Sequence, residues 1–326
     1  MKKVVVTGGA GFIGSHLVEK LLGSGHSVLV LDSFVTGHPE NLKKHKNLKV
    51  VEVDVCDFEK ISKYFVNIDW VFHLAALADI VPSVSDPLKY LRNNIDATIS
   101  VLEASRQSKV KKFVYSASSS CYGIAEQYPT PETAKINPEY PYALSKYMGE
   151  ELVLHYGKVY NLPVISLRLF NVYGPRARSS GTYGAVFGVF LSQKLSGKPY
   201  TVVGDGEQTR DFTFVTDVAN AFFLAAESKK SGRIFNVGSG GAYSINEIVK
   251  LLGGSVTYIP KRPGEPDCTY ADITKIKKEL NWKPEVSLEK GVNILLENID
   301  LWKNAPVWTP ESIKRVTKDW FESLKK

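Results

Sequence analysis

The chain has 326 residues, of which 44% are hydrophobic and 23% charged, and this excludes a disordered chain and a small disulfide scaffold. Its net charge of +7 comes mainly from dispersed lysines without a block of like charges, so we expect no nucleic-acid partner. The 3 cysteines are isolated and lack the paired spacing of a zinc site, which predicts a reducing compartment and no metal centre.

The first apolar run, Val4 to Val6, is too short for the core of a signal peptide. No stretch approaches the roughly 18 apolar residues of a membrane-spanning helix. We therefore expect a cytoplasmic protein without a membrane partner.

Up to residue 170, short β-branched runs alternate with longer amphipathic segments, which is typical of βαβ units around a parallel sheet. The pattern predicts a Rossmann-type, doubly wound α/β domain over residues 1–170. The expected strands are 3–7, 27–31, 48–53, 70–73, 112–116 and 164–167. The expected helices are 12–22, 58–65, 87–105 and 141–160.

After residue 170, glycine and proline interrupt the sequence more often, which predicts a loop-rich second half. We expect residues 171–326 to form mainly a smaller, mixed α/β substrate-binding lobe, with later strands returning to the first domain near 212–238. The expected elements here are a strand at 234–237 and helices at 244–252, 272–280 and 287–302. Residues 302–326 suggest no function.

A glycine-rich segment, Thr7 to Gly14, follows the first expected strand and leads directly into a helix. Glycines in this turn let the backbone approach a pyrophosphate, and the free N–H groups of the helix start attract its charge. A plain glycine-rich turn is the alternative, but strand, glycines and helix agree on a dinucleotide site. Its candidate residues are Gly8, Gly11, Phe12, Ile13 and Gly14.

Asp32 ends the second expected strand, where its carboxylate can accept hydrogen bonds from both hydroxyls of an adenosine ribose. The same charge repels a 2′-phosphate, so the sequence favours NAD over NADP. An aspartate at a strand end is also an ordinary turn former.

Tyr142 and Lys146 lie one turn apart on an expected helix, so both side chains can face one site. The pair is weak evidence alone, but it follows a strand that ends in a hydroxyl cluster, Ser116 to Ser120, at the edge of the sheet where ligands bind. A nearby ammonium favours the phenolate, which predicts that the pKa of Tyr142 is lowered from its reference of about 10. Tyr142 would then serve as a general base toward an alcohol.

With these motifs the chain resembles the extended short-chain dehydrogenase/reductases of the NAD-dependent nucleotide-sugar epimerase/dehydratase family, in its UDP-glucose 4-epimerase-like form. The resemblance runs over nearly the whole length. Its further marks are His73-Leu74-Ala75-Ala76, Asn94, the stretch from Ser118 to Gly123, that from Arg168 to Pro175, Gly204-Asp205-Gly206 with Arg210-Asp211, Asn236-Val237-Gly238, and Arg262-Pro263-Gly264.

The resemblance implies roles for residues around the cofactor. Tyr142 is expected to be the base, Lys146 to hold the nicotinamide ribose and depress the tyrosine pKa, and Ser118 to hydrogen-bond the reacting oxygen. Asn94 is expected to be structural or to hold a water. The residues that match the adenine contacts and the wall of the cofactor cleft are Asp54, Val55, Leu74, Ala75 and Ala76.

The implied substrate is a nucleotide-diphosphate sugar. Asn171, Arg210 and Arg262 match positions that hold the diphosphate, and guanidinium groups suit this because their forked donors pair with phosphate oxygens. A surface salt bridge is the alternative for either arginine. Glu265 matches a nucleotide-ribose contact at which relatives often carry aspartate, which leaves the choice of nucleotide open.

Ser119 and Ser120 occupy positions at which relatives that eliminate water carry acidic groups and decarboxylases tend to carry a glutamate. Their hydroxyls supply no titratable group, which favours a 4-epimerase of the UDP-glucose/UDP-galactose or N-acetylhexosamine type that works through a transient 4-keto intermediate. A 4,6-dehydratase, an epimerase at another carbon, a net dehydrogenase or reductase, and a non-catalytic NAD-binding scaffold stay open.

The family also commonly dimerises through two long helices of each subunit, which here are the expected helices 87–105 and 141–160. We therefore expect a homodimer. Leu152, Val153 and Tyr156 belong either to that interface or to the core.

Overall fold

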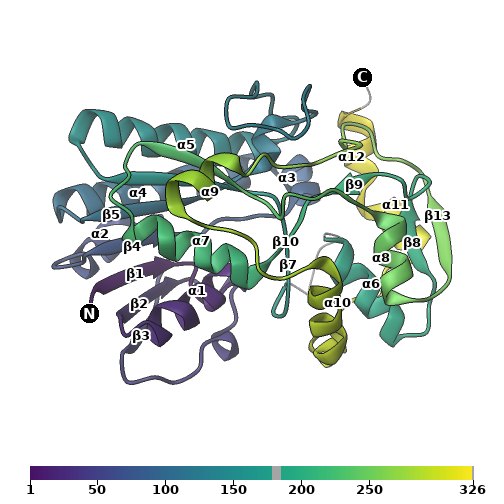
Figure 1. The fold of residues 1–326 in the computed structure, drawn as a ribbon, viewed down its shortest axis with the longest axis horizontal. Helices are drawn as coiled ribbons and strands as arrows, with labels where there is room; N and C mark the ends of the chain where they lie inside the picture. Colours follow the sequence, from purple (N-terminus) through teal and green to yellow (C-terminus); the bar gives the residue numbers. More distant parts are fainter. Residues whose placement is uncertain (178–184, 325–326) are drawn as a thin grey trace.

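The computed structural model describes residues 1–177 and 185–324, and its larger lobe is built around a seven-stranded parallel sheet of order β11-β6-β5-β4-β1-β2-β3 (Figure 1). The predicted Rossmann-type sheet is confirmed, and the expected strands recur with ends shifted by at most two residues. The strands are β1 (Lys3–Thr7), β2 (Ser27–Asp32), β3 (Leu48–Glu52), β4 (Trp70–His73), β5 (Lys112–Ser118), β6 (Val164–Leu169) and β11 (Arg233–Val237).

Helices cover both faces of this sheet, which explains why its strands are almost continuously apolar. The helices are α1 (Phe12–Gly23) and α7 (Val215–Glu227) on one face, and α2 (Phe58–Ile61), α4 (Pro87–Gln107) and α5 (Pro141–Tyr160) on the other. Val4 and Val6 of β1 pack into the core under α1 and α7, whereas Val5 packs into the core on the other face, under α4 and α5. Val153 is fully buried in that second core.

The smaller lobe is mixed α/β, as the sequence predicts, and lies beyond the carboxyl ends of the strands (Figure 1). Short paired strands and surrounding helices enclose a core of their own. Its strands are β7 (Asn171–Tyr173) with β10 (Phe212–Phe214), β8 (Tyr200–Val203) with β13 (Val256–Ile259), and β9 (Thr209–Arg210) with β12 (Tyr243–Ser244). Its helices include α6 (Val186–Leu195), α8 (Ile245–Leu252), α10 (Leu288–Glu297), α11 (Pro310–Val316) and α12 (Lys318–Ser323).

The second half is less loop-rich than predicted, because it contains two helices, α6 and α7, that the sequence did not predict. Neither helix has a sequence signal at its start. Ala185 and Phe214 precede them, and neither side chain caps the helix. α6 is also apolar on nearly all sides, so it lacks the periodicity of a surface helix. The expected helices 58–65 and 287–302 each end early and continue as a 3₁₀ turn.

The helix α9 (Thr274–Leu280) packs beside β11 on the larger lobe, and the short helix α3 (Ile80–Ser85) follows β4. β11 pairs with β6 over its whole length, from Arg233 opposite Ile165 to Val237 opposite Leu169. The second half of the chain therefore supplies an edge strand of the first sheet, while the division into lobes at residue 170 stays a prediction. Within the described ranges, no helix combines the length and apolar character needed to cross a membrane.

Candidate active site

A cleft of about 680 Å³ runs along the carboxyl ends of the strands and continues between the two lobes. Ligands of doubly wound folds bind at this edge, next to the point where the strand order reverses, which here lies between β1 and β4. The structure brings all the candidate residues to this one cleft: Gly8, Gly11, Phe12, Ile13, Gly14, Asp32, Asp54, Val55, Leu74, Ala75, Ala76, Ser118, Tyr142, Lys146, Asn171, Arg210, Arg262 and Glu265.

At one end of the cleft, the turn between β1 and α1 has no room for side chains. Gly8 has a φ of +69°, and a Cβ there would lie 2.7 Å from the backbone nitrogen of Ala75. A Cβ on Gly14 would lie 2.1 Å from the Gly8 carbonyl oxygen. Gly11 precedes α1 without a side-chain cap, so the first N–H groups of the helix remain available to a pyrophosphate.

Asp32 is fixed at the end of β2 by two backbone donors and is only 6% exposed. Its Oδ2 accepts a hydrogen bond from the Ala10 N–H and its Oδ1 accepts one from the Phe34 N–H, both at 2.9 Å. Each carboxylate oxygen retains a further lone pair for a ribose hydroxyl. The glycine turn and this carboxylate together fit NAD.

The hydroxyl cluster after β5 is internally hydrogen-bonded. The Ser118 and Ser120 hydroxyl oxygens lie 2.8 Å apart, and the Ser120 N–H donates to Ser118 Oγ at 3.2 Å. Tyr142 lies in the first turn of α5, and its backbone N–H donates to Ser83 Oγ at 3.2 Å. Ser118 also hydrogen-bonds the Tyr142 side chain, so the two proposed partners of a substrate hydroxyl are adjacent.

The predicted lowering of the Tyr142 pKa is wrong for the protein alone. Burial raises the pKa of Tyr142, the hydrogen bond with Ser118 opposes this shift, and the negative charge of Asp79 adds to it. Lys146 is not among the groups that shift it. The sequence showed the spacing of the two side chains on the helix but not the depth at which both are buried.

Lys146 is itself strongly affected by burial. Burial lowers its pKa to about 7, against a raising contribution from Glu150 one turn later. Its ammonium lies over the ring of Tyr115. A lysine in this state titrates near neutrality, so its charge depends on what binds beside it.

Behind the cleft, Asn94 is a structural residue. Its Oδ1 accepts from the Leu77 N–H at 2.8 Å, and its Nδ2 donates to the Leu77 carbonyl at 3.0 Å and to Ser145 Oγ at 2.8 Å. These bonds join α4 to α5 and to the loop after β4. This agrees with the structural role expected for Asn94.

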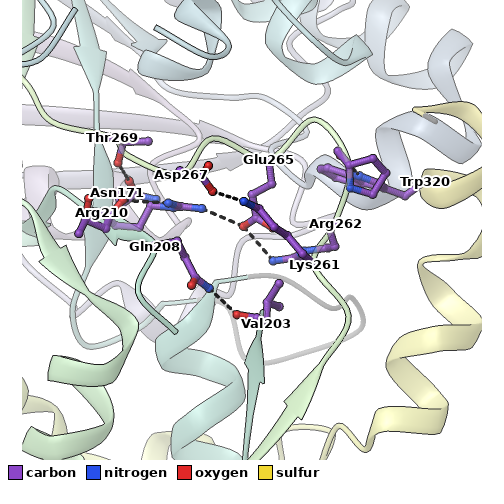
Figure 2. A network of polar contacts seen from close by, with 12 residues as sticks. Asn171, Val203, Gln208, Arg210, Lys261, Arg262, Glu265, Asp267, Thr269 and Trp320 are labelled. Carbon is purple, nitrogen blue, oxygen red and sulfur yellow. Dashed lines mark hydrogen bonds and ion pairs between the residues drawn. The ribbon is translucent and has the colours of Figure 1, made fainter. Parts of the chain in front are cut away.

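At the other end of the cleft, Arg210 and Arg262 share one carboxylate (Figure 2). Arg262 donates to both oxygens of Glu265, at 2.7 and 3.0 Å, and Arg210 donates to one of them at 3.0 Å. Burial alone would raise the pKa of Glu265, but the charges of Arg262 and Arg210 outweigh it and hold the pKa below its usual range. Asn171 lies on the same side, where its Oδ1 accepts from Thr269 Oγ1 at 2.9 Å.

Sequence reasoning missed several residues that line the cleft. Tyr140 directly precedes α5, and its side chain hydrogen-bonds Ser120 and lies near Glu265 and Arg210. Asp79 lines the cleft, and its negative charge raises the pKa of Tyr142. Tyr140 stands two residues before Tyr142, and this position could have indicated that Tyr140 belongs to the site. No local signal could have indicated Trp308 and Trp320, which reach the cleft from the C-terminal segment.

Comparison with known families explains this arrangement. Residues 4–238 match the model of the NAD dependent epimerase/dehydratase family. The chain belongs to this family. The family and NAD as its cofactor, both expected from the sequence, are thereby confirmed, and the protein is an enzyme of the NAD-dependent epimerase/dehydratase family.

Relatives in this family match nearly the whole chain. A putative UDP-glucose 4-epimerase from Methanocaldococcus jannaschii is 37% identical over 297 residues, which cover 89% of this chain and 95% of that protein. The structure of UDP-glucose 4-epimerase from Thermotoga maritima with UDP-glucose is 37% identical, with a TM-score of 0.87 over 91% of this chain and 98% of that one. UDP-glucuronic acid decarboxylase 2 from Arabidopsis thaliana is 33% identical over 310 residues, covering 91% of this chain and 68% of that protein. Members with different reactions thus match at similar identity.

Proposed function

We propose that this family member is a nucleotide-sugar 4-epimerase of the UDP-glucose/UDP-galactose or N-acetylhexosamine type. The observation that carries the proposal is one cleft that is lined by the glycine turn, by Ser118, Tyr142 and Lys146, and by the Arg210–Arg262 pair. Such a cleft suits a molecule with a reacting hydroxyl at one end and a diphosphate at the other. The 4-epimerases among the relatives support the same assignment.

In this proposal NAD, when bound, would supply reversible hydride transfer at sugar C4, with return to the opposite face of the sugar, so no net redox change would occur. Tyr142 accepts the proton of the C4 hydroxyl and later returns it to the oxygen of the 4-keto sugar. Ser118 hydrogen-bonds the same oxygen, and Lys146 binds the nicotinamide ribose. Arg210 and Arg262 hold the diphosphate while the 4-keto sugar rotates about its diphosphate link between the two half-reactions.

The residues after Ser118 support epimerisation over elimination or decarboxylation. Ser119 and Ser120 supply hydroxyls, and that of Ser120 is already hydrogen-bonded to Ser118. Eliminating water across C5 and C6 needs an additional acid and base at the sugar. The carboxylate of Asp79 lines the cleft, and its negative charge raises the pKa of Tyr142.

The test is incubation of the enzyme with a panel of UDP-, dTDP-, GDP- and CDP-sugars, followed by proton NMR of the products. Inversion at C4 without release of NADH supports the proposal. A 4-keto-6-deoxy product would show a dehydratase, and loss of carbon dioxide from a uronic acid would show a decarboxylase. Stoichiometric formation or consumption of free NADH would show a net dehydrogenase or reductase.

We also propose that the enzyme is a homodimer that pairs through α4 and α5. Val153 belongs to the core, and Leu152 and Tyr156 pack against it, but other apolar side chains of the two helices face solvent. These are Leu88, Ile99, Leu144, Met148, Val159 and Tyr160. Light scattering of the wild type and of Met148→Glu tests this, with a dimer expected for the first and a monomer for the second.

A further inference from the structure

The C-terminal segment, residues 302–324, is folded into the smaller lobe. Trp302, Ile313 and Trp320 are all buried in the core of that lobe. Thr309 caps α11 by accepting a hydrogen bond from the Ser312 N–H at 3.3 Å. The segment therefore has a fixed place beside the cleft.

The same segment forms part of the wall of the cleft through Ala305, Pro306, Trp308 and Trp320. Side chains of α6 anchor its first part. Gln193 Nε2 donates to the Trp308 carbonyl at 2.8 Å, and Ser192 Oγ donates to the Pro306 carbonyl at 3.2 Å. The cleft would be open on this side without these residues.

Trp320 of α12 contacts the loop that carries Arg262, at the end of the cleft where the diphosphate is proposed to bind. Its indole Nε1 donates to the Pro263 carbonyl at 2.7 Å, and the guanidinium carbon of Arg262 lies 5.9 Å from its ring centre. Figure 2 shows this indole beside the Arg262 side chain. The centre of the Tyr140 ring lies 5.7 Å from the centre of the indole ring. One side chain thus joins the loop of Arg262 to the start of α5, which carries Tyr142.

These contacts restrict an arginine that would otherwise be mobile. Glu265 binds the guanidinium of Arg262 through two hydrogen bonds, and the guanidinium lies just inside the limit of about 6 Å for a cation–π contact with the indole. An arginine loses much rotamer freedom when it binds a phosphate, so partners that hold it beforehand reduce that loss. Trp320 also fixes the backbone next to Arg262 through the Pro263 carbonyl.

We propose that α12 belongs to the substrate site, with Trp320 as a positioning residue that holds Arg262 ready for the diphosphate of a nucleotide sugar. The inference rests on the proposed function, which supplies the diphosphate. Because Trp320 acts through Arg262, its loss should weaken binding of the diphosphate more than binding of the nucleoside, and should affect the rate of the chemical step less. No part of the reaction requires the indole to touch the reacting carbon.

The experiment measures binding of UDP, dTDP, GDP and CDP to the holoenzyme by calorimetry, and then of the matching nucleoside to the same protein. For Trp320→Ala we expect about tenfold weaker binding of the nucleoside diphosphate and little change for the nucleoside, in line with a lost cation–π contact and hydrogen bond. Trp320→Phe keeps a ring but loses the donor, so an intermediate loss is expected. With the preferred sugar nucleotide, KM should rise more than kcat falls. Phe321→Ala on the same helix is the control.

A double variant makes the test specific. If Trp320 acts through Arg262, Trp320→Ala adds almost no further loss in an Arg262→Gln background. Full additivity, or an equal loss for nucleoside and nucleoside diphosphate, would assign Trp320 a merely structural role and overturn the inference. Wild-type binding that Trp320→Ala leaves unchanged would also overturn it. A wild-type enzyme that binds none of the nucleoside diphosphates would overturn the proposed function as well.

Discussion

The ammonium of Lys146 lies 4.5 Å from the centre of the Tyr115 ring, and Tyr115 in turn donates a hydrogen bond to the Lys146 carbonyl at 3.3 Å. Burial lowers the pKa of this lysine to about 7. In the unfolded chain a lysine keeps its proton up to about pH 10.4. Between about pH 7 and pH 10.4 the folded protein therefore binds fewer protons than the unfolded chain. The buried charge destabilises the folded protein most below about pH 7.

Lys146→Met should remove this contribution to the pH dependence of stability. The destabilisation by the lysine is fully present below about pH 7 and fades as the pH rises, so the stability advantage of the variant should shrink by up to about 1.4 kcal/mol per pH unit above pH 7. Urea unfolding of both proteins in the same cofactor state, at several pH values between about 6 and 9, measures this. A stability difference that does not vary with pH would contradict the assigned burial. The exposed Lys318→Met is the control.

Tyr142→Phe should lower kcat for epimerisation by about a hundredfold to ten-thousandfold, because it removes the group that accepts and returns the proton. NAD content and the stability of the fold should change little. Rates on the preferred sugar nucleotide measure the effect, and Tyr147→Phe on the same helix is a matched control. Unchanged biological activity in Tyr142→Phe, together with no action on any sugar nucleotide, would instead indicate a non-catalytic NAD-binding scaffold.

Asp32→Asn should weaken NAD binding by about tenfold or more, since it removes charged acceptors of the adenosine ribose hydroxyls. It should also narrow the preference for NAD over NADP, because the repulsion of a 2′-phosphate is lost. Titration of cofactor-free protein with each dinucleotide gives the affinity ratio. The same ratio in wild type and variant would argue against this role. Asp57→Asn, which changes the N-cap of α2 outside the cleft, is the control.

Glu265→Gln should lower the stability of the ligand-free enzyme by about 1–2 kcal/mol, because Arg210 and Arg262 lose their shared counter-charge. A bound diphosphate restores negative charge at this point. The amide oxygen that replaces the carboxylate can still accept a hydrogen bond from Arg262 and help to hold it, so the gain in charge complementarity should dominate and the rise in melting temperature on adding UDP should be larger for the variant than for the wild type. Equal rises would show that the diphosphate binds elsewhere.

The sequence predicts those parts of the site that depend on local spacing. The glycines of Thr7 to Gly14 lie in one strand-to-helix connection, and Tyr142 and Lys146 lie one helical turn apart, so their geometry follows from the local structure that carries them. The contact of Trp320 with Pro263 joins positions far apart in the chain, and no local pattern encodes it. The same holds for the pKa of Tyr142, which depends on the depth of burial set by the whole fold.

The position of β11 beside β6 bears on how the chain acquires its structure. β6 is buried along its whole length, and β11 covers the edge that it would otherwise present. A fragment that stops at residue 170 would expose this row of unpaired backbone groups on an apolar strand, which is a template for aggregation. During synthesis, the cofactor-binding sheet can be completed only after residue 237 has left the ribosome. By then α6 and the strands β7, β8, β9 and β10 of the smaller lobe have already emerged.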